Sequence, residues 1–519
     1  MSEEKKEEKK IDRRKYIKYV GAGAAVAAAA AIGYGVSELT RPPPPPPPTP
    51  TTVVQTVLKT ETLPGTTIVR TEERTVVQTV SPTAPPKKRL TIWWATEYVA
   101  AEQLTIMKLI DQYQKEKGVE VNVEFYSGPD LNTKLMVASE ASPPAVPDLA
   151  FNIVPFTSSV MAYKGLLRDV TDIIKPRENE ILPQCLEVAK AYNRLTKKRS
   201  YYVVPTTVIC LYLHVWKNLI KESGYPYPPP MEYDAFHQTM IKVAEHYKKY
   251  AFAYSMSDNN PDGENNFEQY LLLHGGRLVD GDTLLADRPE NKRAIIEVLS
   301  EGAEWFKKGY IPPGSIKGGG AWNNDAFISQ QCVCCNGNPT MSIPAYLYEN
   351  DREAYFVKTA TLPWPLGTNG KDAPQFIEAR AFVIFKDGPN PDAAVEFIEW
   401  LIEYDRYMSW LKGMYGRYLP MYKEALEDPF YVNGQTPPKH LLAQYPDLKD
   451  EHVPNTALYL SKKPGIVVSH QQSPVFARAW AEYLVGKMWT RVCVENWKPE
   501  DAAEEYLTRI KQLWKEEYG

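Results

Sequence analysis

The chain has 519 residues, more than one ordinary domain needs and enough for two or three. Its formal net charge of −4 and its pI of about 6.1 exclude a global positive field that would attract nucleic acid. Aromatic residues make up 12% of the chain, with 33 Tyr and 12 Trp. Such rings fill cores or stack on flat ligand faces, and core packing is the default expectation.

Residues 1–12 alternate Glu and Lys and predict a solvated, charged cytoplasmic tail. Residues 13–37 open with Arg13 and Arg14 and continue as an uncharged Ala/Gly-rich run. Positive charge followed by an apolar stretch is typical of a signal peptide or a membrane anchor. The segment resembles a twin-arginine export signal, although Asp12 stands where Ser or Thr is usual. Its apolar run of about 18 residues is short for a membrane span, so cleavage stays open, and we favour a retained anchor.

Residues 38–87 are rich in Pro, Thr and Val and predict a stalk. The tract 42–48 is all proline, which favours the extended polyproline II conformation. The motif Val-Val-Gln-Thr-Val occurs at 53–57 and again at 76–80. This order of tail, anchor and stalk predicts a domain held on the extracellular face of a prokaryotic cell, in particular an archaeal one.

From residue 88 the composition becomes globular, and the first elements predict a parallel sheet. An apolar strand is expected at 90–95, a helix with apolar residues at helical spacing at 100–117, and an alternating strand at 119–125. A strand, a helix and a strand with short joints form a βαβ unit. Further strands are expected at 147–152 and 201–205, and residues 208–215 are expected to cross into a second lobe.

Six cysteines are too few for a disulfide scaffold, and their spacing does not fit a zinc site. The cluster at 332–335 lacks the two paired Cys-x-x-Cys motifs of a zinc site, and no His follows it at ligand distance. We therefore expect buried small side chains, no metal and no cofactor. One or two disulfides remain the alternative if the domain is extracellular, with the pairing open. The six are Cys185, Cys210, Cys332, Cys334, Cys335 and Cys493.

A series of short motifs in fixed order resembles the family 1 extracellular solute-binding proteins, which include maltose-binding protein. Each motif is weak alone, and their spacing over residues 88–519 carries the likeness. Two departures are His214, where Asn is usual, and residues 376–380, which replace a Gly-rich stretch. The motifs are Pro147-Asp148, Gly165-Leu166-Leu167-Arg168-Asp169, Tyr202-Val203-Val204-Pro205, Thr361-Leu362-Pro363-Trp364-Pro365 with Gly367, and Gly416 with Leu419-Pro420.

The resemblance implies an α/β, two-lobed periplasmic-binding-protein-like fold (type II), with a ligand cleft between the lobes and a hinge of crossing strands. It places lobe one at 88–207 plus 356–392, and lobe two at 208–355 plus 393–519. It also implies a monomeric substrate-binding subunit of an ABC importer. Such a subunit captures a polar solute, with a sugar or oligosaccharide favoured, by hinge closure and delivers it to permease subunits.

Ligands of open α/β sheets lie beyond the carboxyl ends of strands, so the expected site residues follow strand ends. Of the adjacent Trp93 and Trp94, we assign Trp94 to the cleft and Trp93 to the core, and we expect Trp305 and Trp400 in the core. Arg380 would favour an acidic ligand. The expected ligand-binding residues are Trp94, Thr96, Glu97, Asn152, Phe156, Trp322, Asn324, Asp325, Tyr346, Trp364, Glu378 and Arg380.

Two other classes of function stay open, a secreted, membrane-anchored carbohydrate-active hydrolase and a surface scaffold that binds protein. The sequence has no Gly-x-Ser-x-Gly elbow, no His-Glu-x-x-His motif and no phosphate-binding loop. Pairs of carboxylates are too common among 64 Asp and Glu to indicate a glycosidase. We therefore expect a binding protein without catalytic residues, and the sequence does not name its solute.

Overall fold

The computed structural model describes residues 54–63, 66–75, 88–96, 98–151, 155–258, 262–338, 341–463 and 465–518. Only the backbone is described for 54–63, 66–75, 129, 155–157 and 337–338. Contacts divide the chain into two units, Met1–Pro86 and Lys87–Gly519. The expected tail and anchor lie outside the described residues. Within the described ranges, no helix is both long enough and apolar enough to cross a membrane.

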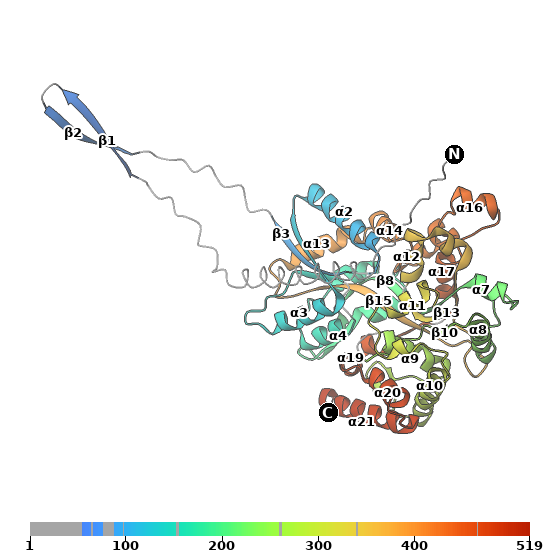
Figure 1. Cartoon of the computed structure of the whole chain (residues 1–519). Coiled ribbons are helices and arrows are strands. Elements are labelled where there is room, and N and C mark those ends of the chain that lie inside the picture. The colour runs from blue at the N-terminus through green and yellow to red at the C-terminus, as the bar shows by residue number, and fades with distance from the viewer. Residues whose placement is uncertain are drawn as a thin grey trace, which may run out of the picture. The chain divides into compact units, whose positions relative to one another are not determined.

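The first unit contains a β-hairpin inside the segment expected to be a stalk (Figure 1). Strands β1 (Val54–Leu63) and β2 (Thr66–Thr75) pair antiparallel over 10 residues each. The β-branched Val and Thr residues of this segment favour extended strands, and a Pro-Gly pair between the two strands favours a turn. The stalk prediction did not include a hairpin, because it was based on the low complexity of the segment.

The first lobe of the second unit is built on a sheet in the order β16-β8-β15-β5-β3-β4. β3 pairs parallel with β4 and β5, while β15 pairs antiparallel with β5 and β8. The predicted βαβ unit is confirmed as β3, helix α2 (Ala100–Lys117) and β4, and α2 ends at Gly118 with a left-handed φ of 66°. The strands are β3 (Arg89–Ala95), β4 (Glu120–Tyr126), β5 (Leu149–Phe151), β8 (Val204–Cys210), β15 (Gln375–Ile384), β16 (Leu419–Pro420) and β17 (Gly465–Val467), which pairs with β15.

Helices cover both faces of this sheet, so successive residues of β3 are buried on opposite sides. Leu90, Ile92 and Trp94 pack with helices α2, α13 (Pro391–Leu401), α14 (Tyr404–Gly413) and α17 (Val453–Lys462). Trp93 and Ala95 pack on the other face with α3 (Gly128–Glu140) and α4 (Pro155–Lys164). This double cover follows from the parallel strands, which are connected by helices.

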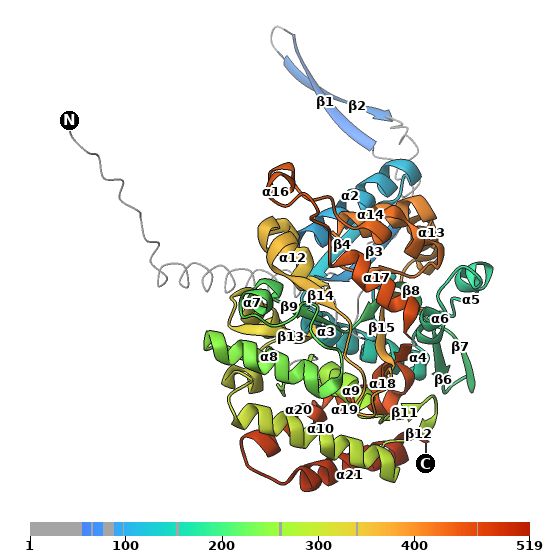
Figure 2. The ribbon, with the colours of Figure 1, turned by 90° about the vertical axis from the view of Figure 1, so that its right-hand side faces the viewer.

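The second lobe is built on a smaller sheet in the order β10-β13-β9-β14. Figure 2 shows α2, α13 and α14 at the top, β8 and β15 in the middle, and α8, α10 and α21 at the bottom. The strands are β9 (Tyr212–Val215), β10 (Tyr250–Phe252), β13 (Cys332–Asn338) and β14 (Ala360–Leu362). The main helices are α8 (Tyr233–Tyr247), α9 (Asp262–Leu273), α10 (Pro289–Lys307), α11 (Trp322–Ile328), α12 (Ser342–Asn350), α18 (Ser469–Gln472), α19 (Pro474–Ala481), α20 (Leu484–Cys493) and α21 (Pro499–Tyr518).

Short elements complete the two lobes. Two small hairpins, β6–β7 and β11–β12, each form a separate two-stranded sheet. These elements are α5 (Thr171–Ile174), α6 (Pro183–Ala189), β6 (Lys190–Asn193), β7 (Lys198–Tyr201), α7 (Lys217–Glu222), β11 (Val279–Asp280), β12 (Thr283–Leu284), α15 (Pro429–Asn433) and α16 (Lys439–Gln444), with the short helices Lys175–Arg177, Pro313–Ile316, Ala354–Lys358 and Glu424–Glu427.

All six cysteines are buried and none is joined in a disulfide in the structure, so the expectation of buried small side chains is confirmed. Residues 332–335 are fully buried because β13 is an interior strand of the second sheet. Burial raises the pKa of the thiols of Cys210 and Cys493 to about 12, since a thiolate would lose its hydration there. Within the described ranges, no group of three metal-ligating side chains comes together.

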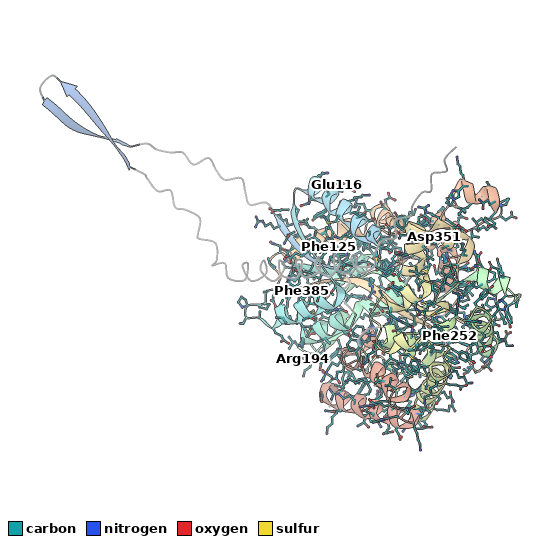
Figure 3. The ribbon with its side chains drawn as sticks, in the orientation of Figure 1. Glu116, Phe125, Arg194, Phe252, Asp351 and Phe385 are labelled. Carbon is teal, nitrogen blue, oxygen red and sulfur yellow. The ribbon has the colours of Figure 1, made fainter. Side chains whose placement is uncertain are left out.

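The chain passes between the lobes along β8 and β15. β8 leads directly into β9 of the second lobe. Along β15, Phe376 packs in the second core and Ile377 in the first. Figure 3 labels Phe252, a core residue of the second lobe, and Phe385, a core residue of the first. Two adjacent crossing strands therefore connect the two lobes.

Packing assigns several segments to the lobes differently from the sequence prediction, helix α17 among them. Residues 360–373 were expected in lobe one, but β14 pairs with β9 and this stretch packs in the second core. Helices α13 and α14 were expected in lobe two, but both pack in the first core. The reason is that β15 returns the chain to the first sheet, and the helices that follow cover the nearest exposed face of that sheet.

Candidate functional site

Tyr98 of the first lobe contacts two residues of the second lobe. It follows the carboxyl end of β3 and precedes α2, where ligands of α/β sheets commonly bind. Its hydroxyl donates a hydrogen bond to Oδ1 of Asp325 on α11 at 3.1 Å. Its ring centroid lies 5.8 Å from that of Tyr346 on α12. Burial and the Asp325 carboxylate raise the pKa of Tyr98, which therefore keeps its donor proton.

Trp322, the first residue of α11, is held against a glycine-containing loop. A Cβ at Gly318 would lie 2.4 Å from the Trp322 ring, and one at Gly314 would lie 3.0 Å from its Nε1. A Cβ at Gly318 would overlap the indole, and one at Gly314 would make a tight contact with it. Trp322, Tyr98 and Tyr346 are all half-buried, so each ring keeps part of its surface accessible. Half-buried aromatic rings are suited to stacking on the CH faces of a sugar ring.

Two ion pairs lie buried beside these aromatics. Arg380 Nη1 lies 2.7 Å from Glu378 Oε1, and both residues are on β15. Arg417 Nε lies 3.0 Å from Oε1 of Glu102 on α2, and the side chains are 4% and 6% exposed. Charges this deeply buried are stable only when they are paired and hydrogen-bonded. The positive charges of both arginines are therefore compensated within the protein.

A buried carboxyl, Asp262, lies between these pairs at the start of α9. Burial raises the pKa of Asp262 to about 7; a hydrogen bond with Asn323 opposes the rise, as do the charges of Arg380 and Arg417. The Asp262 carboxyl on α9 therefore interacts with Asn323 on α11 and with Arg380 on β15. Nearby on α9, both polar atoms of the buried Asn266 amide have no hydrogen-bond partner among the described residues. The site therefore combines carboxyl, amide and phenol groups.

Six of the residues expected from sequence lie in this region. Trp322, Asn324 and Asp325 belong to α11 and Tyr346 to α12, opposite Tyr98. Glu378 and Arg380 form the ion pair on β15. Sequence reasoning missed Tyr98, Glu102, Asp262, Asn323 and Arg417. An aromatic residue directly after the expected strand-end residues Thr96 and Glu97 was the available signal for Tyr98.

Trp94 and Trp364 were expected in the cleft, but the structure buries both. Trp94 is 4% exposed, and its ring centroid lies 4.1 Å from that of Phe151. Trp364 is 3% exposed, and its Nε1 donates to the carbonyl of Leu211 at 2.8 Å. Covered rings cannot stack on a solute, because protein side chains already occupy their faces. Trp305 and Trp400 are buried, as predicted.

The remaining expected residues follow β3 and β5. Thr96 is exposed, and its hydroxyl donates to the carbonyl of Tyr126 at 3.0 Å. Glu97 and Asn152 lie outside the described residues, as does the side chain of Phe156.

Comparison with known proteins identifies one family. The family described as bacterial extracellular solute-binding protein matches residues 108–438, more than half of the chain. No curated protein sequence matches significantly.

Solved structures show the same fold at low sequence identity. An ABC transporter solute-binding protein from Thermotoga lettingae bound with alpha-D-tagatose is 19% identical, with a TM-score of 0.64 over 82% of this chain and 100% of that one. Maltose-bound MalE3 of T. maritima is 17% identical, with a TM-score of 0.63 over 82% and 99%. A solute-binding protein from Agrobacterium radiobacter in complex with ribitol is 19% identical, with a TM-score of 0.61 over 82% and 98%. The two-lobed α/β fold expected from the sequence is thereby confirmed.

Proposed function

The chain belongs to the family of bacterial extracellular solute-binding proteins, and we propose that it captures a neutral, polyhydroxylated solute between its lobes for an ABC importer. The family consists of binding proteins, so the expectation that the chain is not an enzyme is confirmed. The observation that carries the proposal is the contact of Tyr98 with Asp325 and Tyr346 across the two lobes. A solute held beside that contact would be enclosed by both lobes at once.

The chemistry of the site supports a sugar or a polyol. Half-buried rings of Tyr98, Trp322 and Tyr346 offer apolar faces, and Asp325 and Asn266 offer a carboxylate and an amide for hydroxyl groups. The structures of similar fold contain tagatose, maltose and ribitol, all of them polyhydroxylated. When the lobes close, each lobe would supply some of these rings and polar groups.

The charge balance of the site favours a neutral solute over an acidic one. Arg380 alone would favour an anion, but its guanidinium lies 2.7 Å from the Glu378 carboxylate. Arg417 is paired with Glu102 in the same way. An anion would therefore approach arginines whose positive charge is already balanced by a carboxylate, so it would gain little net attraction from either.

We place the binding domain on the outer side of the cell membrane. The family is extracellular, and residues 13–37 have the charge order of an export signal or anchor. In this arrangement the segment 38–87 spaces the domain from the membrane, and a permease receives the solute.

A ligand screen tests the proposal. The melting temperature of the protein is measured with neutral sugars, oligosaccharides, polyols, sugar acids and peptides, because a ligand that binds only the folded state raises it. We expect a rise with at least one neutral sugar or polyol and binding without turnover. A rise with sugar acids or peptides alone would contradict the proposed solute class.

A further inference from the structure

A groove separate from the candidate site lies between α3 and α4 of the first lobe and α19 and α21 of the second. Its volume is about 350 Å³. Met136, Val160, Pro474, Ala477 and Ala481 supply apolar surface from both lobes. This volume is at the low end of the range of small-molecule pockets, roughly 300–1,000 Å³.

Positive charge predominates at the edge of the groove. Lys164, Arg194 and Arg478 line it, against the one carboxylate of Glu517. Arg478 is bound to Glu517 and Glu516, at 2.7 Å from each. Lys164 lies 3.6 Å from Glu140. Two of the three cations are thus already neutralised.

Arg194 is the exception. The part of the chain that the structure describes gives it no carboxylate within ion-pair distance, and its guanidinium lies 5.6 Å from the centroid of the Tyr163 ring. Figure 3 labels Arg194 at the lower edge of the first lobe, close to the C-terminal helices. The groove therefore combines an apolar surface with one uncompensated, exposed guanidinium.

Contacts of α4 with the second lobe border the groove. Ser159 Oγ donates to the carbonyl of His470 at 3.1 Å, and Tyr163 Oη donates to the carbonyl of Glu517 at 3.1 Å. Residues of the groove and of the candidate site do not overlap. Since both lobes form its walls, an occupant would contact both lobes and favour this relative position of the two.

We propose that this groove is a second binding site, for a small amphiphilic monocarboxylate. The alkyl chain lies on Met136, Val160 and Ala481, and the carboxylate pairs with Arg194. Charge complementarity selects the occupant, because an apolar surface beside one free cation matches an apolar molecule with one negative end. The solute proposed above, a neutral polyol, matches neither feature, so the two sites take different ligands.

The test uses octanoate on the full chain, with 1-octanol and acetate as partial ligands. Titration calorimetry and thermal melting are carried out without any sugar, so the result does not depend on the proposed solute. We expect octanoate to bind and, at ten times its Kd, to raise the melting temperature by about 1–3 °C. Octanol and acetate are expected to bind at least tenfold more weakly.

Two variants and a matched control locate the site. Ala481→Trp fills the groove from an exposed position, and Arg194→Glu reverses the cation; each should abolish the octanoate effect. Lys198→Glu makes the same change of charge on an exposed residue of the same hairpin, and should retain it. The proposal is overturned if octanoate does not bind, if octanol binds equally well, or if Arg194→Glu and Ala481→Trp both bind octanoate like the unaltered protein.

Discussion

The hydroxyl of Tyr98 donates a hydrogen bond to the carboxylate of Asp325, 227 residues further along the chain. The bond joins a loop that follows the first strand of one lobe to the helix α11 of the other. It is the type of contact that exists only while the lobes are close together. If the lobes close on solute as proposed, the strength of this bond contributes to the free energy of closure.

Tyr98→Phe and Asp325→Asn should each weaken binding of the solute identified by the screen. Loss of one partly exposed hydrogen bond to a carboxylate is expected to cost about 1 kcal/mol, or roughly fivefold in Kd. Titration calorimetry measures the change. Tyr445→Phe removes a hydroxyl from an exposed tyrosine elsewhere and should leave Kd unaltered. An unchanged Kd in both site variants would show that this contact takes no part in closure.

Trp322→Ala should weaken binding of a sugar by about tenfold or more, through loss of stacking area. Trp497→Ala is the matched control, because Trp497 is also partly exposed, at 38%, and lies against Arg491 at the far end of the second lobe. Titration calorimetry measures the Kd of the sugar for each folded variant, and only Trp322→Ala should raise it. Equal affinities would mean that Trp322 does not contact the solute.

Trp94→Ala should lower stability rather than affinity. The ring is enclosed by Phe151, Phe382 and Trp410, so truncation leaves a cavity that costs about 3–5 kcal/mol of unfolding free energy. Denaturation in guanidinium chloride measures the loss. A variant that is as stable as the unaltered protein but binds the solute much more weakly would show that Trp94 belongs to the binding site.

Glu264 and Glu268 should make stability depend on pH. Glu264 accepts a hydrogen bond from the backbone N–H of Val485 at the start of α20, and Glu268 accepts one from Ser469 at the start of α18. Burial raises the pKa of Glu264 to about 8 and that of Glu268 to about 7. The folded state thus holds these protons more tightly than the unfolded chain, where the ordinary value is 4.5.

This contribution to stability is full below about pH 4.5 and is lost as pH rises through 7 to 8. The unfolding free energy of the unaltered protein, relative to Glu264→Gln, should fall by about 4 kcal/mol between pH 5 and pH 9. Glu290→Gln, at an exposed glutamate in the first turn of α10, should show no such trend. Parallel pH profiles for all three proteins would contradict the assignment.

The full chain should fractionate with membranes, whereas a protein that starts at Lys87 should be soluble and bind solute equally well. The reason is that residues 13–37 carry the anchor pattern, while Lys87–Gly519 forms a compact unit of its own. Ultracentrifugation of cell lysates followed by immunoblotting measures this. Recovery of the full chain from the cytosol alone would refute the anchor.

Local patterns in the sequence determined the secondary structure of the binding domain. The βαβ unit at the start of the first lobe follows from the change between the periods of strand and helix, and from Gly118 at the end of α2. Trp305 and Trp400 could be assigned to the core for the same reason, since their apolar neighbours recur at helical spacing. These signals act over a few residues, where the chain itself fixes the geometry.

The composition of the site was decided only by the tertiary structure. A strand period of two places Trp93 and Trp94 on opposite faces, but it does not indicate that Phe151, Phe382 and Trp410 enclose the Trp94 ring. The partners Tyr98 and Asp325, and likewise Glu102 and Arg417, lie 227 and 315 residues apart. No local pattern specifies such pairs, because only the path of the whole chain through the two lobes brings these distant residues together.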